Sequence, residues 1–169
     1  MSDSLKLVRQ LREITGAGIL DCKKYLERSN NNLDAAIKLF RTESGKKAEK
    51  KSSRIAAEGL VNYFENSKSI LILELNSETD FVAKDENFIS LSESIAEILL
   101  NQDESDNMET INKIITESIS KLGENIKLRR YLKIDKNNNL YGYTHNNKIV
   151  SIVELKNPDE QLAKDICMH

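Results

Sequence analysis

The segment Ile70-Leu71-Ile72-Leu73-Glu74-Leu75 is the most hydrophobic run in this chain of 169 residues. It is short and rich in branched apolar side chains, which is typical of a β-strand that is buried on both faces. We therefore expect a well-anchored strand here, and we expect this strand to hold the polar residues that follow it.

The next ten residues are Asn76-Ser77-Glu78-Thr79-Asp80-Phe81-Val82-Ala83-Lys84-Asp85, and a helical pattern of apolar residues follows them at Phe88, Leu91, Ile95 and Leu99. Loops between such elements often carry functional contacts. The residues alone leave two interpretations open. Either Phe81 packs into the core while Asp80 caps the following helix, or both side chains face a partner. The first is favoured by the general tendency of isolated aromatic side chains to be buried.

The composition, with 39% hydrophobic and 31% charged residues, predicts a water-facing protein. The longest apolar run is far below the ~20 residues that a membrane span needs, and the amino terminus has no signal-peptide pattern. The two cysteines, Cys22 and Cys167, are too few for a disulfide framework, which indicates a reducing compartment. We expect a cytoplasmic protein that is not bound to a membrane.

Residues 1–44 are predicted to form three short helices. Their apolar stripes are Leu5, Val8 and Leu11, then Ile19, Cys22 and Leu26, and finally Leu33, Ala36, Ile37 and Phe40. Asn32 is the expected N-cap of the third helix. Residues 45–56, which begin with the lysine-rich run from Gly45 to Arg54, are interpreted as a basic, solvated linker.

Residues 57–169 are predicted to form an α+β core, an antiparallel sheet with helices packed on one side. The segment 57–125 contains strands near 60–64 and 70–75 and helices near 85–100 and 108–122, the second of which ends at Gly123. The segment 126–169 contains strands near 126–134, 140–145 and 148–155, expected to pair as hairpins, and a final helix. We interpret this second segment as an incomplete subdomain.

Charge is distributed unevenly between these parts. Residues 1–54 contain 13 Lys and Arg against 7 Asp and Glu, a net charge of +6, and the remaining residues contain 12 against 20, a net charge of −8. Such an asymmetry can orient a charged partner. Direct binding of nucleic acid is not expected, since no aromatic platform lies near the lysines.

The residues that catalysis or cofactor binding would require are missing from the sequence. No glycine-rich phosphate loop occurs, and the two histidines and two cysteines have no spacing suited to a metal. Glu78 and Asp80 could form an acid/base pair, but neither a nucleophile nor an oxyanion donor lies nearby. We therefore expect a binding protein that is not an enzyme and has neither a cofactor nor a metal of its own.

Two further features allow two interpretations each. Ile19 and Leu20 follow the glycine-containing break Thr15-Gly16-Ala17-Gly18, and one of the two must point away from the helical core. That residue is either a partner contact or an ordinary surface residue. His145 ends a predicted strand beside a polar turn, where it is either a hydrogen-bonded surface histidine or a contact residue.

Several stretches, in this order and at this spacing, resemble the elongation factor Ts family, the nucleotide-exchange factors of the translation GTPase elongation factor Tu. The stretches are Leu7-Val8 with Leu11-Arg12, Thr15 to Gly18, Asp21 to Lys24, Thr79-Asp80-Phe81-Val82-Ala83-Lys84, Gly123-Glu124-Asn125-Ile126 with Arg129-Arg130, and Tyr143-x-His145. The resemblance extends over essentially the whole chain. It implies a translation elongation factor with a ubiquitin-associated-like three-helix head, and it favours an outward-facing Phe81.

The resemblance also implies roles for individual residues. Thr79, Asp80, Phe81 and Val82 match the family segment that displaces Mg²⁺ from elongation factor Tu, with Phe81 as a wedge near the nucleotide and Asp80 holding the loop. Ile19, Leu20 and Lys23 match contacts to the GTPase domain of that partner. Gly123 and His145 match further contact positions, and Lys51 matches one in the basic linker. The resemblance implies that the partner is bound through its GTPase domain and a neighbouring domain. The alternative function is a docking module without exchange activity.

Family members often continue beyond the Met-His that ends the last helix here, with a second half-core and a coiled-coil protrusion. We therefore expect a C-terminally short or truncated form, which is a fragment, a product of gene decay, or a compact protein that completes its core as a homodimer. The family also implies the bacterial cytosol, or an organelle if the source is eukaryotic.

Overall fold

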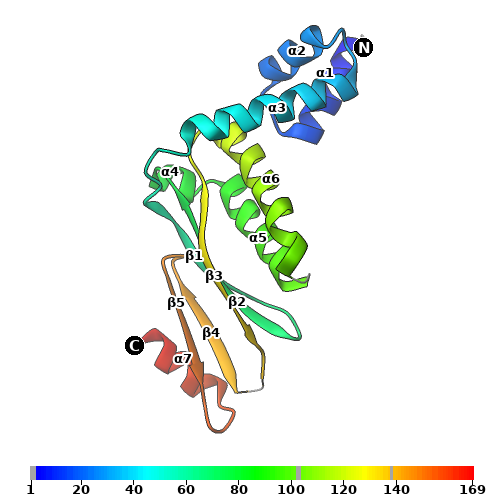
Figure 1. Ribbon diagram of the computed structural model, residues 1–169. Coiled ribbons are helices and arrows are strands. Elements are labelled where there is room, and N and C mark those ends of the chain that lie inside the picture. The colour runs from blue at the N-terminus through cyan, green and yellow to red at the C-terminus, as the bar shows by residue number, and fades with distance from the viewer. Residues whose placement is uncertain (1–2, 102–103, 138) are drawn as a thin grey trace.

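The computed structural model of this chain describes residues 3–101, 104–137 and 139–169. It is an α+β structure in which a helical module at the N-terminal end joins a layered core of sheets and helices (Figure 1). The predicted fold class is confirmed. Among the described residues, no helix has both the length and the apolar character required to cross a bilayer.

The N-terminal module consists of α1 (Asp3–Thr15), α2 (Ile19–Arg28) and α3 (Leu33–Lys51). Its core includes the edge-to-face pair Tyr25 and Phe40, whose ring centroids are 5.6 Å apart. Asn32 caps α3 as predicted, because its side chain accepts a hydrogen bond of 2.9 Å from the backbone N–H of Ala35. Leu5 and Ile19, which were expected in the buried stripes, are instead 55% and 56% exposed. In α2 the buried stripe begins at Cys22 and includes Tyr25, so the first turn of the helix lies outside this small core.

Helix α3 extends further than the sequence indicated. The expected linker began at residue 45, but residues 45–51 continue the helix, so only residues 52–57 connect it to the first strand. Lysine is a good helix former, and the basic side chains lie at the negative end of the helix dipole. Packing also favours this extension, since Ala48 contacts the core that lies beneath α6 (Glu104–Leu122). A 3.4 Å ion pair between Arg41 and Glu117 further links the two helices.

The main sheet has the order β1-β2-β3 and is antiparallel throughout, with β1 at Glu58–Glu65, β2 at Ser69–Ser77 and β3 at Lys127–Asp135. The predicted hydrophobic strand is therefore the central one. Leu71, Leu73 and Leu75 are fully buried under α5 (Glu86–Asn101) and α6, which cover one face of the sheet. Burial of the other face is incomplete, because Ile70 is fully buried but Ile72 and Glu74 are only partly buried.

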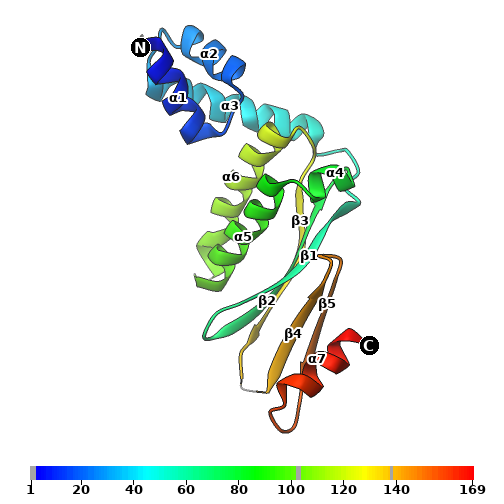
Figure 2. The same cartoon turned by 180° about the vertical axis from the view of Figure 1, so that it is seen from behind.

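The other face of the sheet is partly covered by a hairpin formed by β4 (Leu140–His145) and β5 (Ile149–Glu154). Helix α7 (Glu160–Met168) packs on the far side of this hairpin through Ala163 and Cys167 (Figure 2). The expectation that all three C-terminal strands pair as hairpins was wrong for β3, which pairs with β2. Leu128 of β3 lies opposite Leu75 and packs against the helix-covered core, so burial of apolar surface accounts for this pairing.

Candidate functional site at the turn after strand β2

The backbone after β2 turns sharply into the short helix α4 (Asp80–Ala83). Thr79 is its N-cap, with φ −125° and ψ 158°, and its hydroxyl accepts a hydrogen bond of 3.4 Å from the backbone N–H of Val82. Ser77 donates its hydroxyl to the carbonyl of Thr79 at 2.9 Å. We refer to Thr79, Asp80, Phe81 and Val82 as the 79–82 turn.

Phe81 is the only large apolar side chain of this turn that points into solvent. It is 82% exposed, whereas Val82 and Ala83 pack against the core beneath the sheet. The interpretation that Phe81 packs into its own core was therefore wrong. Because the two residues that follow Phe81 are directed inward, the backbone directs its benzyl ring outward.

Asp80 does not cap the helix, since Thr79 does. Its carboxylate instead forms a 2.8 Å ion pair with the Lys84 ammonium one helical turn away. The hydrogen bond and the charge of Lys84 lower the pKa of Asp80, and Asp80 in turn raises the pKa of Lys84. Asp80 thus carries a full negative charge at neutral pH beside the exposed ring.

The turn is also stabilised by Glu124, a residue distant in the sequence that was not among the expected site residues. One oxygen of its carboxylate accepts the backbone N–H groups of Glu78 at 3.0 Å and Thr79 at 2.9 Å. The other accepts the Thr79 hydroxyl at 2.6 Å. A reciprocal bond of 2.6 Å runs from the backbone N–H of Asn125 to the carboxylate of Glu78. The sequence contained the Gly-Glu-Asn motif, but no local pattern indicates a contact across 45 residues.

Lys51 and Gly123 lie together next to this network. Gly123 ends α6 as predicted, with a left-handed φ of 82°, and the Lys51 ammonium donates a hydrogen bond to its carbonyl. Burial lowers the pKa of Lys51. These two residues therefore contact each other within the chain, at the end of α6 that leads directly into Glu124.

His145 is exposed at the end of β4, with Nδ1 3.2 Å from the Tyr143 hydroxyl and Nε2 3.2 Å from the Asn146 side-chain nitrogen. The hairpin turn that follows it lies close to α4, as shown by a pocket that Asn146 and Lys148 line together with Asp80 and Lys84. The structure therefore places His145 in the same region as the 79–82 turn.

The expected head contacts lie in another part of the molecule. Leu20 is 83% exposed, and Ile19 and Lys23 are exposed beside it on the outer surface of α2. Both members of the apolar pair point outward, where only one was expected to do so. Helix α3, roughly 28 Å long for its 19 residues, lies between this surface and the 79–82 turn (Figure 1).

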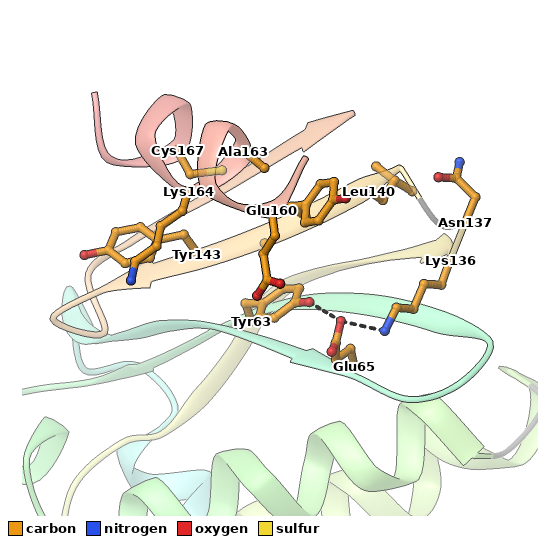
Figure 3. A pocket seen from close by; sticks show the side chains of 12 residues that line it. Tyr63, Glu65, Lys136, Asn137, Leu140, Tyr143, Glu160, Ala163, Lys164 and Cys167 are labelled. Atoms are coloured by element: carbon orange, nitrogen blue, oxygen red, sulfur yellow. Dashed lines mark hydrogen bonds and ion pairs between the residues drawn. The ribbon is translucent and has the colours of Figure 1, made fainter. Parts of the chain in front are cut away.

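An open pocket between β1, β4 and α7 is separate from these residues (Figure 3). Tyr63 donates its hydroxyl to Glu65, which also pairs with Lys136 at 2.9 Å. None of the expected contact residues lines this pocket. In residues 3–101, 104–137 and 139–169, no group of three or more His, Cys, Asp or Glu is arranged to hold a metal ion.

Comparison with known proteins gives two family matches. A model described as elongation factor TS matches residues 78–169, and one described as a UBA-like domain matches residues 3–47. Curated proteins called elongation factor Ts from Xanthomonas oryzae pv. oryzae (strain PXO99A) and Xanthomonas campestris pv. campestris (strain B100) are each 41% identical to this chain over 179 residues. One from Alkalilimnicola ehrlichii is 40% identical over 181 residues. These matches include all of this chain but only 61% or 62% of each relative, so the chain spans about three fifths of their length.

Proposed function

Because this chain belongs to the elongation factor Ts family, we propose that it binds elongation factor Tu in its GDP-bound form and promotes the release of GDP. GTP would then load into the empty site, which would return the partner to its active form. In this role the chain is a translation elongation factor of the cytoplasm that acts by binding and makes no covalent change to the nucleotide.

The exposure of Phe81 is the observation that supports this proposal most strongly. An 82% exposed phenylalanine costs solvation free energy in the isolated chain, and a partner pocket that buries it recovers roughly 1.5–3 kcal/mol. The hydrogen bonds to Glu124 fix the backbone of the turn before binding. This preorganisation lowers the entropic cost of inserting the ring.

The proposed mechanism is differential binding of two states of the partner. Bound GDP is held largely by Mg²⁺ and by backbone N–H groups around its phosphates. The 79–82 turn need not contact the nucleotide; it must only bind better to a distorted, metal-poor nucleotide site. Linkage then requires that this chain and GDP weaken each other's binding by the same factor.

The remaining expected residues would supply docking energy. Ile19, Leu20 and Lys23 would bind the GTPase domain of the partner, while Gly123, Lys51 and His145 would contact the surface around the wedge and the neighbouring domain. The energy of burying Phe81 alone corresponds to about a ten- to hundredfold effect. A larger acceleration therefore needs further contacts, from Asp80 or the head, that are stronger in the metal-poor state of the partner.

The test is stopped-flow measurement of GDP release from elongation factor Tu loaded with a fluorescent GDP. Micromolar chain should accelerate release in a concentration-dependent way that saturates. Leu20→Ser should raise the concentration needed for half-saturation. Binding without acceleration would favour the docking-module alternative, and a chain that does neither would refute the proposal.

A further inference from the structure

We propose that Glu124 is a positioning residue, whose carboxylate fixes the 79–82 turn and thereby sets the direction in which Phe81 projects. This inference rests on the proposed function, because its activity readout is GDP release. It also makes a prediction for the chain alone, which can be tested without any partner.

The Glu124 carboxylate accepts hydrogen bonds both from the backbone that leads into α4 and from the side chain of Thr79, the N-cap of α4. Its carboxylate accepts the N–H groups of Glu78 and Thr79, the last two residues before α4, at 3.0 and 2.9 Å. Its second oxygen accepts a hydrogen bond of 2.6 Å from the Thr79 hydroxyl. A threonine hydroxyl has only one proton. Because that proton is donated to Glu124, the lone pairs of the oxygen remain free to accept a hydrogen bond of 3.4 Å from the Val82 N–H, which caps the first turn of α4.

Glu124 is itself held firmly enough to act as a reference point. It follows Gly123, whose φ of 82° ends α6, so its backbone is tied to a helix of 19 residues. The next residue, Asn125, donates its backbone N–H to Glu78 at 2.6 Å and its side-chain amide to the carbonyl of Arg54 at 2.7 Å. The segment after α6 therefore both accepts hydrogen bonds from the segment that leads into α4, through Glu124, and donates one to it, through Asn125.

Phe81 depends on this arrangement because its own side chain does not fix its position. A ring that is 82% exposed has few packing contacts, so its direction follows from the backbone of the turn. Loss of the Glu124 carboxylate would leave the two N–H groups and the hydroxyl to water, and the turn would sample other conformations. The partner would then have to order the turn during binding, which weakens the wedge without removing it.

The first experiment is hydrogen–deuterium exchange on the full chain, with Glu124→Ala compared with wild type. We expect faster exchange in peptides that contain residues 77–82, by at least about tenfold for the loss of charge-assisted hydrogen bonds. Peptides from α5 and from residues 69–76 of β2 should keep their protection. Glu117→Ala is the matched control, since it removes a carboxylate within α6 that pairs with Arg41 and not with the turn. Unchanged exchange at residues 77–82 in Glu124→Ala would overturn the inference, whatever the chain does to elongation factor Tu.

The second experiment is a double-mutant cycle on GDP release from elongation factor Tu at saturating chain. Glu124→Ala should slow release by about tenfold or more in the wild-type background, but by less than about twofold when Phe81 is already alanine. A merely structural role would reduce the rate by the same factor in both backgrounds. Glu124→Gln, which keeps one acceptor for the two backbone N–H groups, should restore part of the rate. Full activity of Glu124→Ala would refute the positioning role, whereas an inactive wild type would refute only the proposed function.

Discussion

Phe81→Ala separates the role of this residue in function from any role in stability. The ring is 82% exposed, so its removal should change the free energy of unfolding by no more than about 0.5 kcal/mol, as is usual for surface substitutions. The same substitution at a buried phenylalanine costs about 3–5 kcal/mol. For a chain of this length each kcal/mol moves Tm by about 2–4 °C, so loss of a buried ring would lower Tm by at least about 6 °C and loss of an exposed ring by no more than about 2 °C.

The functional effect should be large in comparison. If the partner buries the ring in the state that has lost GDP, the variant loses roughly 1.5–3 kcal/mol of that binding energy. At saturating chain the release of fluorescent GDP should therefore slow by about ten- to a hundredfold. Ile166→Ala is the control, because Ile166 is an exposed apolar residue of α7, far from α4 (Figures 1 and 2). Its release rate should match that of wild type.

Two outcomes of this experiment would contradict the reasoning. A fall in Tm of more than about 6 °C would mean that the ring packs within its own domain. A release rate equal to that of wild type, with Tm unchanged, would mean that the exposed ring is not the wedge.

Three further predictions concern stability and are checked by thermal denaturation. Burial and the hydrogen bond to Glu43 raise the pKa of Tyr25 to about 12. Because the folded-state pKa lies above the ordinary ~10, this stabilisation is complete below about pH 10 and is lost as the pH rises toward 12, so Tyr25→Phe should flatten the fall of Tm above pH 10. Gly123→Ala forces a side chain into a φ of 82° and should destabilise by about 1–2 kcal/mol; an unchanged Tm would contradict a left-handed C-cap. Gly45→Ala should raise stability by about 0.5–1 kcal/mol, because Gly45 lies inside α3 and the added methyl group would meet no heavy atom within 4 Å; no gain would indicate that residues 45–51 are not helical in solution.

The elements that the sequence predicted well are those whose pattern is repeated over several turns or residues. The apolar run 70–75 became the central strand, and the helical spacing from Phe88 to Leu99 became α5, because each pattern reports burial against one large core. Gly45 and the lysines after it resemble a linker when only the neighbouring residues in the sequence are considered. They are helical because Ala48 and Arg41 find partners in or beneath α6, about 70 residues away in the sequence, and no local window contains that information.

The candidate site likewise depends on contacts between residues that are distant in the sequence. The Thr79-Asp80-Phe81-Val82 segment was recognisable as a motif, yet its residues alone favoured a buried Phe81, since burial is the commoner state of an aromatic side chain. What reverses this preference is the inward direction of Val82 and Ala83 together with the hydrogen bonds that Thr79 donates to Glu124. Such a contact depends on how β2 and the end of α6 meet, which is a property of the fold.

The helical continuation of α3 changes how the two halves of the proposed interface would work together. A flexible linker of residues 45–56 would have let the head bind independently and would have raised the local concentration of the turn only by tethering it. Instead α3 is helical through Lys51, whose ammonium donates to the carbonyl of Gly123, and Gly123 precedes the Glu124 that holds the turn. The head also meets the core at a second place, since Gly16 lies so close to the Lys121 side chain that a Cβ added to Gly16 would be 3.1 Å from the Lys121 Cε. Leu20 and Phe81 are therefore presented at a separation that the fold determines, so a partner that binds the head receives the ring in one geometry rather than in many, and less entropy is lost when the ring inserts.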